Sequence, residues 1–168
     1  MEMRSLGHTG LTVSVLGLGG LFLPSGRSGR AARNVLAAAV EAGIRYVDTA
    51  PAYGESEALL GQALADIREP LVVSTKLGGR PLPFDPRSAS GLRASALESL
   101  RLLGRDVIDV LMVHEPDRPA QVDWWTDPLR CDGPVMDVLE DLRSEGVVRA
   151  IGVGGTTAWE LARVVRTG

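Results

Sequence analysis

The sequence predicts an α/β domain built around a parallel β-sheet. Runs of β-branched and other apolar residues alternate with alanine- and leucine-rich stretches in which apolar residues recur every three and four positions. The runs are apolar on both faces, which is typical of parallel strands that are covered by helices. Five strand-then-helix units in succession imply right-handed crossovers between neighbouring strands.

Each element can be placed in order along the chain. The opening residues are expected to form a hairpin around His8, Thr9 and Gly10 that leads into a first strand near 14–18. Later strands are expected at 44–48, 71–76, 107–114 and 148–155, and helices at 30–42, 56–65, 89–103, 135–145 and 157–165. Glycines 43, 104 and 146 would end helices in left-handed caps.

Two architectures fit this order of elements. A five-stranded doubly wound sheet suits 168 residues, whereas a (β/α)8 barrel takes about 250 and at least about 200. Length alone therefore favours the open sheet. The longest connection, 115–134, is rich in Pro, Asp and Trp, and a loop of that length in a compact domain is more often functional than idle.

Composition excludes several classes of partner. The net charge of -3 provides no basic field for nucleic acid. No apolar run approaches the ~20 residues of a membrane span, and the N-terminus does not resemble a signal peptide, so we expect a cytoplasmic protein without a membrane partner. One cysteine, Cys131, and two histidines offer neither an internal disulfide nor a convincing metal site, and "HEPD" at 114–117 lacks a full ligand set.

Polar residues follow three successive apolar runs. Asp48 ends the second strand, Lys76 the third and His114 the fourth, while Tyr53 follows Asp48 within "YVDTAPAYG". Carboxyl ends of parallel strands meet at one sheet edge, where the active sites of α/β proteins lie. Each residue alone also has a structural explanation, as a turn cap, a solvated strand end or a loop anchor. Their shared position on three strands favours a common site.

Lys76 is the only lysine among 18 basic residues. Mutational bias toward arginine explains this equally well, but the alternative is that the position requires a compact ammonium group. An ammonium beside an aspartate forms an ion pair, and beside a tyrosine it favours the phenolate, lowering a pKa of about 10 in water. Tyrosine would then be a usable proton donor near neutral pH, and His114 could bind the same substrate oxygen.

Aromatic and glycine residues gather in the loops that follow strands. Phe22, Tyr53, Phe84, Trp124 and Trp125 could wall an apolar cleft for a flat ring or an organic substrate, or could simply pack the loops. The clusters "GLGGLF" and "GVGGTT" do not fit a dinucleotide fingerprint. Gly19, Gly20, Gly154 and Gly155 would still let the backbone approach a ligand, with close helix packing an equally good explanation.

The chain resembles the aldo-keto reductase family. The matching segments run in the family's order over essentially the whole chain: "RSLGHTGLTVSVLGLGG", "GIRYVDTAPAYGESEALLGQAL", "VVSTKLG", "SLRLLGRDVIDVLMVHEPD" and "LRSEGVVRAIGVGG". The resemblance implies a (β/α)8 TIM-type barrel closed at its bottom by an N-terminal hairpin, against the preference from length. The segments "DTAPAYG", "STKLGG" and "HEPD" are most similar to bacterial members that oxidise free sugars, or to related dehydrogenases.

The resemblance also implies the chemistry. Asp48, Tyr53, Lys76 and His114 would be catalytic, and hydride would pass between a nicotinamide cofactor, NADP(H) rather than NAD(H), and an aldehyde, ketone or sugar hydroxyl. We expect cofactor contacts from Gly20, Leu21, Asp48, Gly154 and Gly155, and substrate contacts from Phe22, Trp124 and Trp125. The fifth strand departs from the family's Ser-Asn ending, since Gly154 and Gly155 stand there and Thr156 and Thr157 follow.

Only about five βα units are present in the 168 residues. The resemblance therefore implies that residues 1–168 are the N-terminal portion of a single barrel domain, truncated after the fifth unit. The first and fifth strands would be open edges, so we expect self-association. The alternatives to a reductase are a catalytically inactive partial barrel that acts as an assembly or binding module, and a cofactor-independent lyase or isomerase that uses the same residues.

Overall fold

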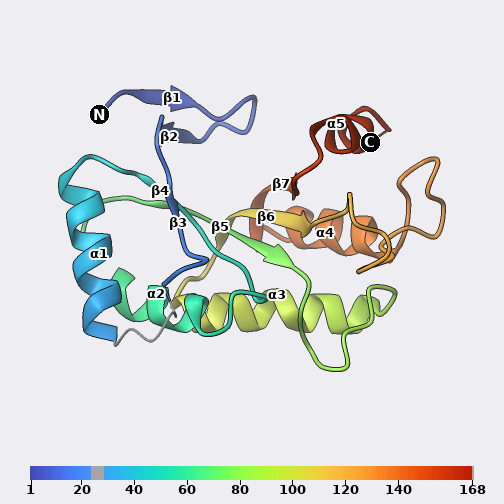
Figure 1. Cartoon of the computed structure of the whole chain (residues 1–168), viewed down its shortest axis with the longest axis horizontal. Coiled ribbons are helices and arrows are strands. Elements are labelled where there is room, and N and C mark those ends of the chain that lie inside the picture. Colours follow the sequence, from blue (N-terminus) through green and yellow to red (C-terminus); the bar gives the residue numbers. More distant parts are fainter. Residues whose placement is uncertain (24–28, 168) are drawn as a thin grey trace.

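The computed structural model describes residues 1–23 and 29–167, which form two sheets and five helices (Figure 1). Strands β1 (Met3–Ser5) and β2 (Thr12–Ser14) form an antiparallel hairpin. The second sheet is parallel and contains β3 (Leu18–Gly19), β4 (Tyr46–Asp48), β5 (Val72–Leu77), β6 (Ile108–His114) and β7 (Val148–Gly154). The helices are α1 (Gly29–Glu41), α2 (Ser56–Leu64), α3 (Ala89–Leu103), α4 (Pro134–Ser144) and α5 (Ala158–Thr167).

The expected hairpin, later strands and helices are confirmed, but the prediction of one strand over 14–18 was wrong. Ser14 ends the hairpin, and the parallel sheet begins only at Leu18. The Ser14 hydroxyl donates to Leu16 O at 2.6 Å and accepts from the Arg45 amide at 2.8 Å. These bonds turn the chain between the two sheets, so the apolar run 14–18 is divided between them.

Strand order in the parallel sheet follows the sequence, β3-β4-β5-β6-β7. A doubly wound sheet reverses its direction of growth at a switch point, and no reversal occurs among the described strands. Successive addition of strands in one direction is the arrangement of a (β/α)8 barrel. The preference that length gave to an open doubly wound sheet was therefore wrong.

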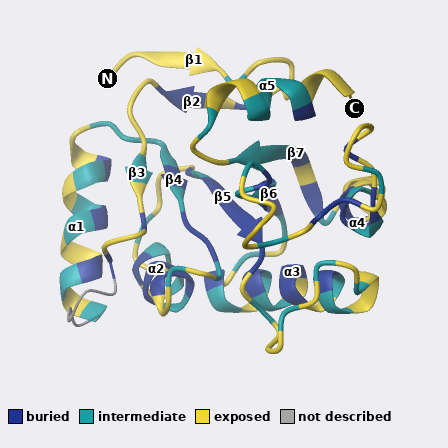
Figure 2. Ribbon diagram, turned by 45° about the vertical axis from the view of Figure 1, so that its right-hand side comes forward, coloured by how far each residue is buried: buried dark blue, intermediate teal, exposed yellow. Residues whose placement is uncertain are grey.

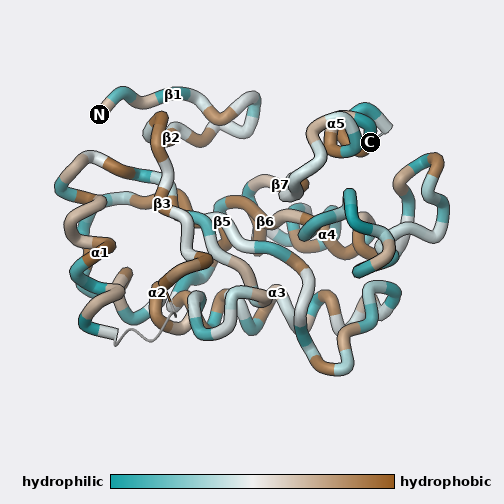
Figure 3. The backbone as a smooth tube through the Cα atoms, viewed as in Figure 1, coloured by the Kyte–Doolittle hydropathy of each residue, from teal (hydrophilic) through white to brown (hydrophobic). Residues whose placement is uncertain are grey.

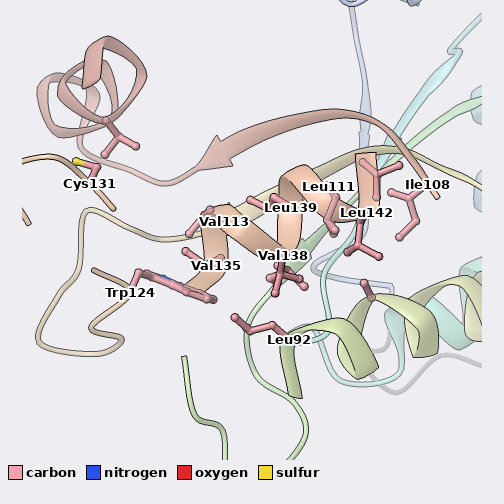
Figure 4. Close-up of a cluster of buried hydrophobic side chains, with 14 of the residues drawn as sticks. Leu92, Ile108, Leu111, Val113, Trp124, Cys131, Val135, Val138, Leu139 and Leu142 are labelled. Carbon is pink, nitrogen blue, oxygen red and sulfur yellow. The ribbon is translucent and has the colours of Figure 1, made fainter. Parts of the chain in front are cut away.

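Helices pack on one face of this sheet. Leu111 and Val113 of β6 lie in a buried cluster with Leu92 of α3 and with Val135 and Leu139 of α4 (Figure 4). A second cluster joins β4 and β5 to helices α1, α2 and α3. Figure 2 shows how far β5 is buried, and Figure 3 shows apolar and hydrophilic residues alternating along the helices, as expected for elements with one buried side.

The other face of the sheet carries the alternate residues of each strand. Val110 and Ala150 are buried there beneath Leu11, which follows the hairpin turn, and Met112 packs beside them. Because side chains alternate across a strand, this face also receives every second residue toward the carboxyl edge. The hairpin covers only part of it, and β1 is exposed throughout (Figure 2).

Helix ends follow the expected signals. Ser88 caps α3 by accepting from the Gly91 amide at 3.1 Å, and Gly104 ends α3 with φ of 64°, in the left-handed region that glycine favours. Gly43 and Gly146 also have positive φ, as expected. Within residues 1–23 and 29–167, none of the helices has the length and apolar character needed to cross a membrane.

Candidate active site

The register of the parallel sheet places three polar side chains on one face at one edge. Asp48 of β4 pairs with Ser74 of β5, and Lys76 lies two residues beyond Ser74. Lys76 in turn pairs with Met112 of β6, and His114 lies two residues beyond Met112. Paired residues and residues two apart share a face. Asp48, Lys76 and His114 therefore all emerge at the carboxyl edge, as the sequence predicted.

Lys76 is the most buried of these residues, at 5% exposure for the residue as a whole. Its ammonium donates to Asp48 Oδ2 and to the carbonyl oxygen of Thr49, each at 2.7 Å. The other carboxylate oxygen of Asp48 accepts from the Ser74 hydroxyl at 2.6 Å. A buried ammonium needs such a partner, because an unpaired charge in the interior is very costly.

Tyr53 lies in the turn between β4 and α2. Its amide donates to Ala50 O at 3.0 Å, and its carbonyl accepts from the Ser56 amide at 3.2 Å, so the turn backbone is fixed at both sides. The ring is half-buried, and its centre lies 4.8 Å from Lys76 Nζ. The turn thereby brings the phenol over the one lysine of the chain.

His114 packs against the Tyr53 ring edge-to-face, with ring centres 5.6 Å apart and an interplanar angle of 79°. Burial, and then the positive charge of Lys76, lower the pKa of His114 below 6.5, although Glu115 and Asp48 oppose this. The imidazole is therefore neutral at pH 7 and has one N–H donor and one acceptor nitrogen. Trp124 Nε1 donates to the carbonyl oxygen of His114 at 2.9 Å and holds the strand end in place.

These four residues line a single pocket of about 320 Å³. Met112, Glu115, Gly154, Gly155 and Thr156 complete its lining. Of the expected cofactor contacts, Asp48, Gly154 and Gly155 thus lie at the pocket. The two-residue period of a strand could have predicted Met112 in the lining, since it lies two residues before His114. No sequence pattern predicts Glu115 or Thr156 there.

Gly20 and Leu21 lie away from this lining, on the β3 side of the sheet. A Cβ at Gly20 would lie 2.6 Å from Ser56 Oγ and 2.9 Å from Asp48 O. Close packing of β3 against β4 and α2 therefore accounts for this glycine. Leu21 is 50% exposed and Phe22 74% exposed, and neither lines the pocket.

The two tryptophans expected to contact substrate are buried, at 1% for Trp124 and 4% for Trp125. Trp124 packs among core residues (Figure 4), yet one part of it lines a second pocket of about 220 Å³ that shares His114 and Glu115 with the first. Phe84 lines the same second pocket, with its ring centre 5.6 Å from that of Trp124. Trp125 lines neither pocket, because it packs its loop onto the core.

A hollow of about 820 Å³, larger than either of these two pockets, lies elsewhere. Its lining includes Arg45, Arg105 and Asp109 near the amino ends of the strands, together with Met3 and Thr12 of the hairpin, and none of the four residues above. The chemistry therefore points to the smaller pockets at the carboxyl edge. Among the described residues, no three His, Cys, Asp or Glu side chains gather as a metal site would require.

The fold and the pocket define an α/β protein of the sequentially ordered, parallel type, with its ionisable residues at the carboxyl edge of the sheet. A family model described as "Aldo/keto reductase family" matches residues 15–168. The chain belongs to the aldo/keto reductase family.

Several characterised proteins are similar to this chain. The 6-dehydroglucose reductase of Novosphingobium aromaticivorans is 39% identical in an alignment that covers 95% of this chain and 53% of that protein. A D-threo-aldose 1-dehydrogenase from a Pseudomonas species is also 39% identical, over 79% of this chain and 46% of its own. The NADH-specific methylglyoxal reductase of Escherichia coli is 32% identical, over 100% and 56%. The chain spans about half the length of the curated relatives it matches.

Solved structures agree with the fold. A candidate aldo-keto reductase of Pseudomonas aeruginosa superposes with a TM-score of 0.80 and 37% identity, covering 99% of this chain and 64% of the other. An aldo-keto reductase from Bacillus halodurans, in its holo form, gives a TM-score of 0.72 and 31% identity over 91% and 50%. These matches confirm the TIM-barrel type of the fold, with five βα units of the barrel in this chain.

Proposed function

We propose that this chain carries the catalytic residues of a nicotinamide-dependent reductase or dehydrogenase that interconverts a carbonyl group and an alcohol. The observation that carries the proposal is the arrangement of Lys76, which is ion-paired with Asp48 and lies 4.8 Å from the centre of the Tyr53 ring. The relatives named above, which include a sugar dehydrogenase and two reductases, support the same reaction class.

The pocket suits a nicotinamide group in size and in polarity. Its volume of about 320 Å³ is at the lower end of ligand pockets, and its lining combines charged groups with two glycines. A Cβ at Gly154 would lie 3.3 Å from Lys76 Cε and 3.6 Å from Met112 Sδ. Glycine at this position therefore leaves the space beside the lysine free of a further side chain. Gly154, Gly155 and Thr156 would contact the nicotinamide, and Gly20 and Leu21 would contact the cofactor farther out.

Bound nicotinamide supplies a hydride donor or acceptor, and the residues of this chain handle the proton. In reduction, the Tyr53 hydroxyl gives its proton to the substrate oxygen; in oxidation, the phenolate takes the proton from the substrate hydroxyl. The ammonium of Lys76 stabilises the negative charge that Tyr53 acquires. The neutral imidazole of His114 donates its N–H to the same substrate oxygen and orients it.

The second pocket, bounded by Phe84 and Trp124, is the proposed place for the part of the substrate that does not react. It adjoins the first pocket at His114 and Glu115. The proposed substrates are aldehydes, ketones and sugars, and the proposed cofactor is NADP(H) rather than NAD(H). Phe22 is the proposed substrate contact from the β3 side, because a ring that is 74% exposed is free to cover a ligand.

A binding module without catalysis is the second candidate, favoured by the open edges of the sheet. Within the described residues, β3 and β7 each pair with a single neighbour. Unpaired edges next to partly covered apolar residues promote association. Self-association of the chain through these edges is therefore part of this alternative.

Tyr53→Phe separates the two candidates. Turnover of aldehydes and sugars is measured with NADPH and NADH, and Tyr46→Phe is the matched control, because Tyr46 is the other tyrosine of the chain and lies outside the pocket lining. We expect Tyr53→Phe to lower kcat by about 100- to 10,000-fold without changing thermal unfolding. Equal turnover by Tyr53→Phe and the wild-type chain would overturn the proposed function.

A further inference from the structure

The connection between β7 and α5 is held by a residue from a different loop. Asp117, three residues after the end of β6, accepts with Oδ2 from the amides of Thr156 and Thr157, at 3.0 and 2.6 Å. These residues lie 39 and 40 positions further along the chain. Thr156 also lines the pocket of the four catalytic residues.

Gly155 and Asp117 fit together closely. A Cβ at Gly155 would overlap Asp117 Oδ1 and lie 2.9 Å from Leu161 Cδ2 of α5. Any side chain at this position would push the Asp117 carboxylate away from the turn. The glycine that the sequence suggested for close approach to a ligand is thus required for close approach of Asp117.

Asp117 Oδ1 is buried and, in the described part of the chain, accepts no hydrogen bond. Burial tends to raise the pKa of Asp117, but the amides of Thr157 and Thr156 outweigh it and hold the pKa below its usual range. The carboxylate is therefore ionised at neutral pH. It binds the two amides that directly precede α5, at the end of the helix where the helix dipole favours a negative charge.

The neighbouring residue, Arg118, restrains the same wall from its outer side. Arg118 Nη2 donates to Thr156 Oγ1 at 3.1 Å, and Nη1 lies 3.1 Å from Glu115 Oε1. Both Thr156 and Glu115 line the pocket. Because the Thr156 oxygen accepts from Arg118, its hydroxyl hydrogen is left to be donated elsewhere.

We propose that Asp117 is a positioning residue that, with Gly155, holds Gly154 to Thr156 in the shape that receives the nicotinamide group. The inference rests on the proposed function. In this proposal, Asp117 and Arg118 support the wall of the pocket at the end of β7, which is formed by Gly154 and Gly155. Thr156, fixed by its amide and its hydroxyl oxygen, then presents its O–H hydrogen as a donor to the bound nicotinamide.

The test uses Asp117→Ala, Asp117→Asn and Arg118→Ala, with Asp123→Ala as the matched control. Asp123 lies in the same loop but pairs with Arg87 at the surface, away from β7. Two quantities are measured: amide hydrogen exchange at Thr156 and Thr157 without nucleotide, and the Kd for NADPH and NADH from nucleotide fluorescence. Arg118 is exposed, so Arg118→Ala keeps the test valid if Asp117→Ala fails to fold.

We expect Asp117→Ala to speed exchange at both amides and to raise Kd by roughly tenfold, the effect of losing one hydrogen bond or more. Asp117→Asn, which retains an acceptor oxygen, should recover most of both properties, and Arg118→Ala should raise Kd by a smaller factor. Unchanged exchange in Asp117→Ala, or faster exchange with an unchanged Kd, would overturn the inference. Failure of the wild-type chain to bind either nucleotide would instead contradict the proposed function, and with it this role.

Discussion

The ammonium of Lys76 lies 2.7 Å from the Asp48 carboxylate, and only 6% of the lysine side chain is exposed. This pair joins β4 to β5 at the carboxyl edge of the sheet. The Tyr53 ring also contacts the pair, because it lies over the Lys76 ammonium. The pair therefore has a structural role, which is to satisfy a buried charge, and a proposed chemical role, which is to support Tyr53.

Lys76→Arg tests whether the site needs an ammonium group. The planar, larger guanidinium cannot reproduce the contacts with Asp48 and Thr49 in a space this confined. We expect kcat/KM to fall by about 100- to 10,000-fold and thermal unfolding to occur at a lower temperature. Retention of full activity by Lys76→Arg would show that the single lysine among 18 basic residues reflects composition alone.

The pH dependence of stability tests the environment of His114. Its pKa is lowered in the folded chain, mainly by burial, so the unfolded chain binds the proton at a higher pH. The free energy of unfolding should therefore be at its full value above about pH 6.5 and decrease as the pH falls below it. In urea unfolding measured at several pH values, the free energy of unfolding of His114→Gln should therefore decrease less at low pH than that of the wild-type chain. The same pH dependence in His114→Gln and wild type would contradict the burial of a neutral imidazole; His8→Gln in the exposed hairpin turn is the control.

A buried ion pair connects α2, which follows the Tyr53 turn, to the loop after β5, the strand that carries Lys76. Glu57 of α2 accepts from Thr75 Oγ1 at 2.7 Å and lies 2.6 Å from Arg80 Nη1, with 2% of its side chain exposed. Arg80→Ala should lower the free energy of unfolding by about 3 kcal/mol, because it leaves the carboxylate buried and unpaired. Arg93→Ala, which removes an exposed pair with Glu145, should lower the free energy of unfolding much less, because solvent screens an exposed ion pair. If Arg80→Ala cost the same in a Glu57→Gln background as in wild type, the two side chains would not be coupled.

Gly61 sets the approach of α2 to α3. A Cβ at this position would overlap the carbonyl oxygen of Leu102, which is backbone and cannot rotate away. Gly61→Ala should therefore destabilise the protein by about 1–3 kcal/mol, although alanine is the better helix former. At Gly29, the added Cβ would meet only the flexible end of Gln62, so Gly29→Ala should be tolerated. Equal melting temperatures for the two variants would contradict this account of the helix contact.

Much of the fold and the core of the candidate site could be predicted from sequence, because both depend on local periodicity. Apolar runs located four strands of the sheet, and their ends located Asp48, Lys76 and His114. The break between β2 and β3 could not be predicted, since it depends on a bond between Ser14 and Arg45, 31 residues apart. The burial of Trp125 and the contact of Asp117 with Thr157 also arise only when distant loops meet.

The reason for the glycines at the strand ends also could not be predicted from sequence. Their number at the strand ends suggested a ligand, but Gly20 and Gly155 are required by neighbouring side chains of the protein itself. A sequence cannot distinguish these two reasons for a missing side chain. Gly154 and Gly155 both line the pocket and both have protein neighbours that a side chain would crowd, so either reason can apply at these two positions.

Transfer of a labelled hydride from nicotinamide to the product is the decisive test of the proposed reaction. The chain is incubated with NADPH or NADH that carries deuterium at the transferable C4 position, together with an aldehyde or aldose, and the product is analysed by mass spectrometry. We expect deuterium on the new alcohol carbon with the wild-type chain and with Tyr46→Phe, and loss of nearly all label transfer with Tyr53→Phe. Absence of label from the wild-type product, or equal transfer by Tyr53→Phe, would contradict the proposed reaction.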